Sequence, residues 1–543
     1  MKIKEKFTTL LLALTLTVGF TFSGSVQAQE FEPDETSKKF QTLLYFIEHM
    51  YVDSVNGEEL VESAIRSMLE DLDPHSTYFS KEDLQAANEP LNGNFEGIGV
   101  QFNILKDTIF VVAPISGGPS EKVGIMAGDK IVEIEGEIVA GIGITNRDVM
   151  DKLKGPKDTK VEVGIKRRGV DKVLDFEIIR DKIPIYSVDA AYMATPQIGY
   201  VKVNRFARTT MTELQEALID LKEQGMEELI LDLQGNGGGL LNTAIEMADE
   251  FLSEDKMIVY TQGRSFPKNE VFSTREGLWE KGKLVVLIDE GSASASEIVS
   301  GAIQDWDRGM IMGRRSFGKG LVQRPVNLPD GSAVRLTVQK YYTPSGRCIQ
   351  KPYDDGIEAY RREKLERIEH GELWHPDSID FPDSLRFNTN IKKRVVYGGG
   401  GIFPDIFVPL DTTGTSEYFS RLVRRGLTNS FALNYMDKNR KSLAKEYSSS
   451  EDFVKNFTVD ENLKKELIAY AESKEVEFDE EGFKTSEEVI EIRLKALIAR
   501  NLYDYSTFYQ VINELNSTYK RAIKALQDGT FEKLNLAYSK LEN

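Results

Sequence analysis

Hydrophobic positions along the chain change their spacing several times, and each change marks a different kind of domain. From residue 35 to residue 90 apolar side chains recur at helical spacing. The first set is Phe40, Leu43, Leu44, Ile47 and Met50. Residues 92–182 show instead short strand patterns separated by glycines. The pattern predicts a helical region at 29–91 and a β-rich module at 92–182.

Strand patterns that alternate with amphipathic helices begin near residue 197. The expected strands are 198–204, 228–233, 257–260 and 284–288, and the expected helices are 209–223 and 240–252. This alternation predicts a substantially parallel sheet with helices on its faces, whose active groups belong at the carboxyl ends of the strands. Gly235–Gly239 and Gly291–Ser296 both follow strands, so we expect these two loops to meet at one site.

Beyond this segment the pattern is less regular. Pro329-Asp330-Gly331 lies between two strand-like runs and is a hairpin signal. Residues 353–395 are polar and charged and are interpreted as an insertion. Residues 413–543 are largely helical and acidic and carry no chemical motif. We therefore expect an α/β multidomain protein with its α/β core at 183–412 and a helical extension at 413–543.

The N-terminus has the pattern of a secretory signal peptide. Three lysines within the first six residues precede an apolar stretch at 7–22, and Val26-Gln27-Ala28 fits a cleavage site. No later apolar run approaches the roughly 18 residues that a membrane span needs. We expect removal of residues 1–28 and export to the periplasm or cell envelope, without tight membrane insertion. An uncleaved anchor, which would leave the protein membrane-associated, is the alternative.

Composition limits the classes of partner and cofactor. The formal net charge of −19 argues against a nucleic-acid binder, because no basic excess is present to neutralise phosphates. Cys348 is the single cysteine, so no intramolecular disulfide is possible, and with four histidines the chain offers few ligands for zinc. We expect neither a metal nor a cofactor.

The stretch from Leu284 to Gln323 carries the strongest chemical signal. A strand-like run at 284–288 meets the small-residue turn Gly291–Ser296, and a helical pattern follows. A serine at such a junction exposes its hydroxyl, and the unpaired amides of the first helical turn can stabilise an oxyanion. Downstream, Lys319 stands between two glycines, where the backbone can bring its amine close to another group. The pattern predicts a serine–lysine hydrolase.

Other interpretations of these residues remain open at this point. Gly313–Gly320 nearly matches the phosphate-binding loop G-x-x-x-x-G-K-[ST]. However, Gly320 replaces the hydroxyl that should bind Mg²⁺, and a strand-like run follows where a helix should open. His75 could be catalytic, although a lone histidine in a turn is more often structural. The serine candidates are Ser292, Ser294, Ser296 and Ser300, for which helix capping is the structural alternative.

The β-rich module resembles a PDZ domain. The resemblance rests on Phe95-Glu-Gly-Ile-Gly99 and on Gly124-Ile-Met-Ala-Gly-Asp-Lys-Ile131. It implies that loop amides hold a peptide carboxylate while the peptide adds a strand to a sheet edge. The implied peptide-binding positions are Phe95, Gly97, Ile98 and Gly99. A glycine-rich β module without a ligand is the alternative.

Five motifs of this chain resemble those of the C-terminal processing peptidases, the tail-specific serine proteases. The matching segments are Leu72-Asp-Pro-His-Ser76, Asp232-Leu-Gln-Gly-Asn-Gly-Gly-Gly239, Gly291-Ser-Ala-Ser-Ala-Ser-Glu-Ile298, Gly318-Lys319-Gly320 and Tyr342-Thr-Pro-Ser-Gly-Arg347. The match spans roughly residues 40–408 and implies a crotonase-like α/β serine-peptidase core behind the PDZ domain. The insertion at 353–395 and the helical extension depart from the common pattern.

By position, the resemblance makes Ser294 the nucleophile, Lys319 the general base and Gln323 the group that orients the lysine. It places the oxyanion donors on the Ala295 amide and on the glycine loop, at Gly238 and Gly239. A lysine has an ordinary pKa near 10.4, which burial in an apolar pocket can lower enough for the neutral amine to accept the serine proton.

The resemblance therefore implies an endopeptidase that cleaves proteins near their C-termini after the PDZ domain has bound the tail. Its partners would be proteins or peptides with free C-termini. The alternative is an inactive PDZ scaffold that binds protein C-termini. In either case the apolar N-terminal helices allow pairing between subunits, which would give a homo-oligomer.

Overall fold

The computed structural model describes residues 34–379 and 382–539, so the predicted signal peptide lies outside the described residues. The chain divides into two units, residues 1–67 and 68–543. The first unit contains helix α1 (Glu35–Met50) and most of α2 (Gly57–Glu70). Asp34 caps α1 by accepting the Ser37 amide, and most large apolar side chains of α1 are exposed. Pairing through these helices stays a prediction.

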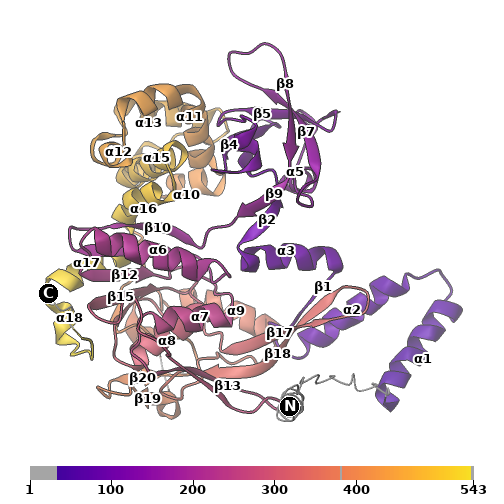
Figure 1. Cartoon of the computed structure of the whole chain (residues 1–543), viewed down its shortest axis with the longest axis vertical. Coiled ribbons are helices and arrows are strands. Elements are labelled where there is room, and N and C mark those ends of the chain that lie inside the picture. The colour runs from indigo at the N-terminus through magenta and orange to yellow at the C-terminus, as the bar shows by residue number, and fades with distance from the viewer. Residues whose placement is uncertain (1–33, 380–381, 540–543) are drawn as a thin grey trace, which may run out of the picture. The chain divides into compact units, whose positions relative to one another are not determined.

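The PDZ-like module, residues 92–182, is a small antiparallel sheet with two short helices (Figure 1). Its strands are β3 (Val100–Ile104), β4 (Ile109–Pro114), β5 (Lys130–Ile134), β6 (Glu137–Ile138), β7 (Lys160–Lys166) and β8 (Leu174–Ile179), and its helices are α4 (Pro119–Lys122) and α5 (Asn146–Leu153). Strands β2 (Asn94–Gly97) and β9 (Asp181–Pro184) pair with each other where the chain enters and leaves the module. In the order β3-β4-β5-β7-β8 strand β3 lies at the edge. Its outer side is therefore open to a further strand.

The α/β core contains the expected parallel sheet. Its strands, in spatial order, are β10 (Val188–Met193), β11 (Ile198–Val203), β12 (Glu228–Asp232), β15 (Lys283–Ile288), β16 (Met310–Gly313) and β21 (Ile406–Phe407). All neighbours from β11 to β21 run parallel, and β10 joins β11 antiparallel. The predicted α/β fold class is confirmed.

Each face of this sheet packs against a different set of helices. Side chains of α6 (Thr210–Glu223), α7 (Leu241–Asp249) and α8 (Ala295–Asp305) share one apolar cluster with alternate residues of the strands, such as Leu231 and Val286. The intervening residues, such as Ile230 and Val285, share another cluster with α17 (Ser517–Gln527) and α18 (Thr530–Lys533). The helical extension therefore supplies the second cover of the parallel sheet, a role that its sequence did not indicate.

A second, antiparallel sheet corrects two expectations. Its strands are β1 (Thr77–Phe79), β13 (Met257–Gln262), β14 (Asn269–Phe272), β17 (Leu321–Asn327) and β18 (Ala333–Tyr342). Strand β13, which we placed in the parallel sheet, pairs antiparallel with β14 and β18, because spacing along the chain does not specify a strand's partner. Strand β1 lies within the region expected to be helical and pairs with β18. This pairing ties Leu72–Ser76 to the catalytic core.

The remaining elements are helices and short strands. They are α3 (Lys81–Asn92), α9 (Ile357–Glu369), η1 (Pro376–Ser378), η2 (Asp383–Leu385), β19 (Arg386–Asn388), β20 (Val395–Tyr397), α10 (Glu417–Arg424), α11 (Leu427–Glu446), α12 (Ser450–Asn456), α13 (Glu461–Glu472), α14 (Glu480–Thr485), α15 (Glu487–Leu502), α16 (Tyr505–Ile512) and η3 (Asn513–Leu515). Leu433 of α11 packs against Phe110 and Val112 of the PDZ-like module. None of the described helices is both long and apolar enough to cross a membrane.

Candidate active site

A cavity of about 650 Å³ lies where the two sheets of the core meet. It is lined by the glycine loop after β12, the start of α8 and the hairpin β17–β18. The residues to which the sequence assigns catalytic or oxyanion roles all line it, namely Gly238, Gly239, Ser294, Ala295, Lys319 and Gln323. Segments that are up to 85 residues apart in the chain are thus brought to one place.

Ser294 differs from the other serines of its turn. Ser292, Ser296 and Ser300 are fully buried, and their hydroxyls donate to the carbonyls of Leu233, Asn236 and Ser296, each at 2.8 Å. Ser294 alone of the four lines the cavity. It is the N-cap of α8 and has φ +55° and ψ −110°, outside the left-handed helical region, a sparsely populated conformation that costs about 1–3 kcal/mol. Such strain is typical of functional turns.

The glycine loop touches this turn. The amide of Ala293 donates to the carbonyl of Asn236 at 3.0 Å, and Gly238 packs directly against the turn that carries Ser294. A Cβ added to Gly238 would lie 2.9 Å from the Ser294 Cβ. The Gly238 amide already donates to Asn236 Oδ1 at 2.9 Å. Among the described residues, the Ala295 and Gly239 amides have no acceptor, so these two are available for an oxyanion.

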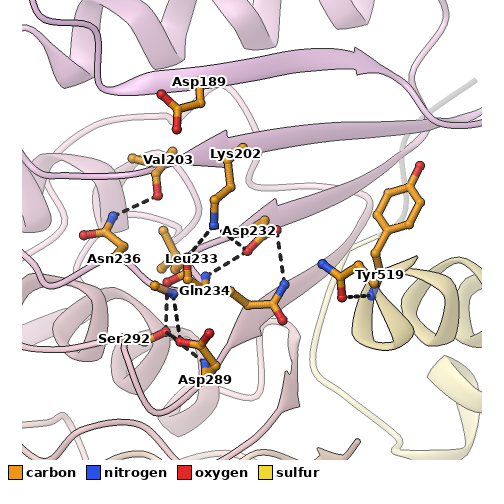
Figure 2. Close-up of polar contacts among 12 residues, drawn as sticks. Asp189, Lys202, Val203, Asp232, Leu233, Gln234, Asn236, Asp289, Ser292 and Tyr519 are labelled. Carbon is orange, nitrogen blue, oxygen red and sulfur yellow. Dashed lines mark hydrogen bonds and ion pairs between the residues drawn. The ribbon is translucent and has the colours of Figure 1, made fainter. Parts of the chain in front are cut away.

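A polar network fixes the glycine loop beneath the cavity (Figure 2). The carboxylate of Asp289 accepts the amides of Gly235 at 2.7 Å and of Gly291 at 2.9 Å, so it joins the two loops. On the neighbouring strands, Lys202 Nζ lies 3.1 Å from Asp232 Oδ1, which also accepts the amide of Gln234 at 2.8 Å. The glycine loop is therefore anchored by a carboxylate on each side, the buried Asp232 and the partly buried Asp289.

Lys319 is partly buried in the wall of the cavity. Burial lowers the pKa of its amine, and the neighbouring Arg335 guanidinium lowers it further. In the described residues no hydrogen bond joins Lys319 Nζ to Ser294 Oγ, and the side-chain amide of Gln323 donates to Thr337 Oγ1 at 3.4 Å. The strand β17 begins at Leu321, where a phosphate-binding loop would require a helix.

Glu297 connects the serine turn to the lysine loop. Its fully buried carboxylate accepts the amides of Ser294 at 2.7 Å, Gly318 at 2.7 Å and Lys319 at 2.9 Å, together with the hydroxyl of Ser316 at 2.5 Å. Burial raises the pKa of this carboxyl. Sequence reasoning missed this residue, although a glutamate three positions after an N-cap serine is the signal of a capping box.

The insertion also reaches the lysine loop. Arg367 of α9 is buried and donates to the carbonyls of Ser316 at 2.8 Å and Phe317 at 3.1 Å, while Glu363 accepts its Nε at 2.6 Å. Tyr360 of the same helix lies 2.7 Å from the Nε2 of His75. Burial lowers the pKa of His75 to about 4, and the charge of Lys319 contributes, so this histidine is neutral at physiological pH.

The four PDZ positions lie apart from the cavity. Phe95 and Gly97 are in β2, and Ile98 and Gly99 form its connection to the edge strand β3. Among the described residues the amides of Ile98 and Gly99 have no acceptor, and Gly99 has φ +73°. Loop and free edge thus lie next to each other, as capture of a peptide carboxylate requires.

Four models of known families match the chain. Peptidase family S41 matches residues 197–359, and a PDZ domain matches residues 97–178. The N-terminal domain of the activating protease CtpB matches residues 21–83. A family of unknown function matches residues 418–504, within the helical extension.

Several curated bacterial proteins are similar over most of their length. A carboxy-terminal-processing protease of Bartonella bacilliformis is 38% identical over 338 residues, which are 60% of this chain and 76% of that protein. The carboxy-terminal processing protease CtpA of Bacillus subtilis is 33% identical over 71% of this chain and 81% of its own length. CtpB of the same organism is 36% identical over 59% of this chain and 67% of its own length.

The substitution Gly238→Ala should remove activity while most of the fold survives. The new Cβ would lie 2.7 Å from the Ala293 carbonyl and 3.0 Å from the Ala295 nitrogen, so the glycine loop must move away from Ser294. We expect kcat for peptide cleavage to fall about a hundredfold or more, as when an oxyanion donor is lost.

Gly235→Ala is the matched control for this substitution. Gly235 also has a positive φ, +69°, but no atom lies within 4 Å of an added Cβ. Gly235→Ala therefore adds comparable backbone strain without the clash, so it should lower Tm and leave kcat within a few-fold of that of the unchanged chain. Equal kcat values for the two variants would show that the contact of Gly238 with the serine turn is not required.

Proposed function

The chain belongs to peptidase family S41, the serine-type C-terminal processing proteases, and we propose that it cleaves proteins near their C-termini with Ser294 as nucleophile and Lys319 as general base. The observation that carries this assignment is the shared cavity. Ser294, alone of the four serines in its turn, faces it, and Lys319 lies in its wall with a lowered pKa. Glu297 holds the backbones of both residues.

The proposed reaction needs one proton acceptor and two oxyanion donors. The neutral amine of Lys319 takes the proton of the Ser294 hydroxyl while Oγ attacks the scissile carbonyl carbon. The amides of Ala295 and Gly239 stabilise the negative oxygen that forms. Lys319 then gives the proton to the departing amine, and water releases the acyl group from Ser294 by the reverse sequence.

Two side chains must change partners for this reaction to proceed. Lys319 Nζ has to come within hydrogen-bond distance of Ser294 Oγ, a bond that often forms only with substrate in place. Gln323 donates to Thr337 in the described structure, and it must exchange this acceptor before its amide can orient the lysine. We propose that a bound peptide strand drives both changes.

The PDZ module is proposed to select the substrate by its tail. The edge strand β3 would pair with the peptide, and the free amides of Ile98 and Gly99 would bind the terminal carboxylate. Amidation removes that carboxylate. We therefore expect the inactive Ser294→Ala chain to bind a free tail peptide at least tenfold more tightly than its amide in calorimetry, and equal affinities would contradict this role.

Export to the periplasm or cell envelope is the proposed location. It is supported by the basic start, apolar stretch and cleavage pattern of residues 1–28. An exported peptidase of this kind would meet protein substrates after their secretion. Fractionation of cells, with mass spectrometry of the mature N-terminus, tests this location; an intact N-terminus in the cytoplasmic fraction would contradict it.

Ser294→Ala and Lys319→Ala should each abolish cleavage of a peptide with a free C-terminus. The first change removes the attacking oxygen, and the second removes the base, so we expect kcat/KM to fall by at least about 10⁴ in both variants. An acylating serine probe should label the unchanged chain but not Ser294→Ala. Absence of labelling in the unchanged chain, with no cleavage, would favour the inactive PDZ scaffold.

The pH profile should report the environment of Lys319. Activity requires the neutral amine, so kcat/KM rises with pH through the pKa of Lys319, which burial and Arg335 both lower. Arg335→Gln removes the neighbouring cation, so the pKa of Lys319 rises and the acid limb should move to higher pH.

Arg324→Gln is the control for this shift, because Arg324 is exposed on β17 and does not line the cavity. Its acid limb should coincide with that of the unchanged enzyme. An acid limb that stays in place in Arg335→Gln would exclude either the neutral lysine as base or the influence of Arg335 on it.

A further inference from the structure

The catalytic cavity is basic although the protein is acidic. Two arginines line it, Arg208 and Arg335, together with the basic side chain of Lys319, and no aspartate or glutamate is among the described residues of its wall. The whole chain has a formal charge of −19. A positively charged cavity wall in an acidic protein attracts anionic groups and disfavours cationic ones.

Arg335 differs from the other partly or fully buried arginines of the core. Arg347 pairs with Asp305 at 2.7 Å, Arg314 with Glu290 at 2.8 Å and Arg367 with Glu363 at 2.6 Å. Among the described residues, Arg335 has no hydrogen bond or ion pair from its guanidinium, which lies 4.9 Å from the ring centre of Phe79. Burial lowers the pKa of this group.

The position of Arg335 in the fold is fixed. It lies on the long strand β18, where its backbone is opposite Pro325 of β17 and Thr77 of β1. A central strand with a neighbour on each side fixes the backbone from which this side chain reaches the cavity wall. A partly desolvated guanidinium without a hydrogen bond or ion pair is unfavourable for the empty protein, and a bound anion would offset that cost.

We propose that Arg335 forms a carboxylate-binding subsite inside the catalytic cavity, with Arg208 adding positive charge at its exposed rim. This inference rests on the proposed function only in placing the substrate in this cavity. A guanidinium binds a carboxylate through two parallel hydrogen bonds, which gives both strength and orientation. The subsite is distinct from the PDZ loop, because neither Ile98 nor Gly99 lines the cavity.

The other residues of the cavity wall indicate which substrate residues would lie next to the bound carboxylate. Much of the wall is apolar, including Leu240, Leu241, Ile298 and Leu321. The preferred segment would therefore present apolar residues near the scissile bond together with one carboxylate. That carboxylate comes either from an aspartate or glutamate side chain or from the C-terminus of a substrate whose end enters the cavity.

The alternative role of Arg335 is to lower the pKa of Lys319 and nothing more. That role would affect all substrates by the same factor, since every substrate uses the same base. A subsite affects only peptides that carry the carboxylate. The ratio of kcat/KM for matched peptides separates the two roles, because any change in Lys319 cancels in the ratio.

The experiment compares the full-length enzyme with Arg335→Met, Arg335→Lys and the control Arg324→Met on four peptides. One pair differs by glutamate against glutamine near the scissile bond, and the other pair differs by a free against an amidated C-terminus. All four peptides are assayed at a pH above the acid limb of the activity profile of every variant. We expect the unchanged enzyme and Arg324→Met to prefer at least one carboxylate peptide about tenfold or more.

In Arg335→Met the preference should fall close to one for the glutamate–glutamine pair, and for the free–amidated pair it should fall to the part that the PDZ loop supplies. In Arg335→Lys the preference should be partly retained because the charge remains. The pair in which the preference falls identifies the source of the carboxylate. The PDZ loop is unchanged in all variants, so its contribution to the amide pair persists and does not obscure the difference. Equal ratios in the unchanged enzyme and Arg335→Met would overturn the proposal.

Binding of the same peptides to Ser294→Ala, with and without Arg335→Met, requires no turnover. A carboxylate preference that depends on Arg335 in this background supports the subsite even if no peptide is cleaved, which separates its outcome from the failure of the peptidase assignment. Preferences that are the same with and without Arg335 overturn it.

Discussion

The carboxylate of Glu297 holds together two segments of the chain, the serine turn and the lysine loop, which are also joined by the bond from the Phe317 amide to the Ser292 carbonyl at 2.9 Å. It accepts the backbone amide of the proposed nucleophile Ser294 and those of Gly318 and Lys319. Tyr341 reinforces this connection, since its hydroxyl lies 2.7 Å from the Lys319 carbonyl and 3.1 Å from that of Ser294. A buried carboxylate with four donors is compact and rigid, so the serine turn and the lysine loop behave as one structure.

The backbone of the site is therefore held more firmly than its reactive side chains. The backbones of Ser294 and Lys319 are held by buried bonds, whereas Lys319 Nζ and the Gln323 amide are not joined to the serine hydroxyl in the described residues. Reorganisation on substrate binding therefore requires only side-chain rotation within a fixed frame. Such motions are fast and small compared with movement of a loop or domain.

Much of this arrangement was predictable from local patterns. Alternation of strands and helices gave the parallel sheet, and the rule that active groups lie at the carboxyl ends of strands brought Gly235–Gly239 and Gly291–Ser296 together. Spacing could not give the partners of β13 or β1, because pairing between distant strands depends on tertiary context. The choice among four serines followed from the motif resemblance, and burial in the structure supplies its physical reason. Arg335 carried no signal at all, since an unpaired charge is visible only when its neighbours are known.

The contact of the insertion with the lysine loop changes the structural role that this segment is given. Arg367 binds the two carbonyls that precede Gly318, and Glu363 of the same helix holds Arg367 in place. A segment that looks dispensable in the sequence has thus become part of the frame around the proposed base. The segment therefore belongs to the support of the site, and a chain shortened to the common core would leave these two carbonyls without this donor.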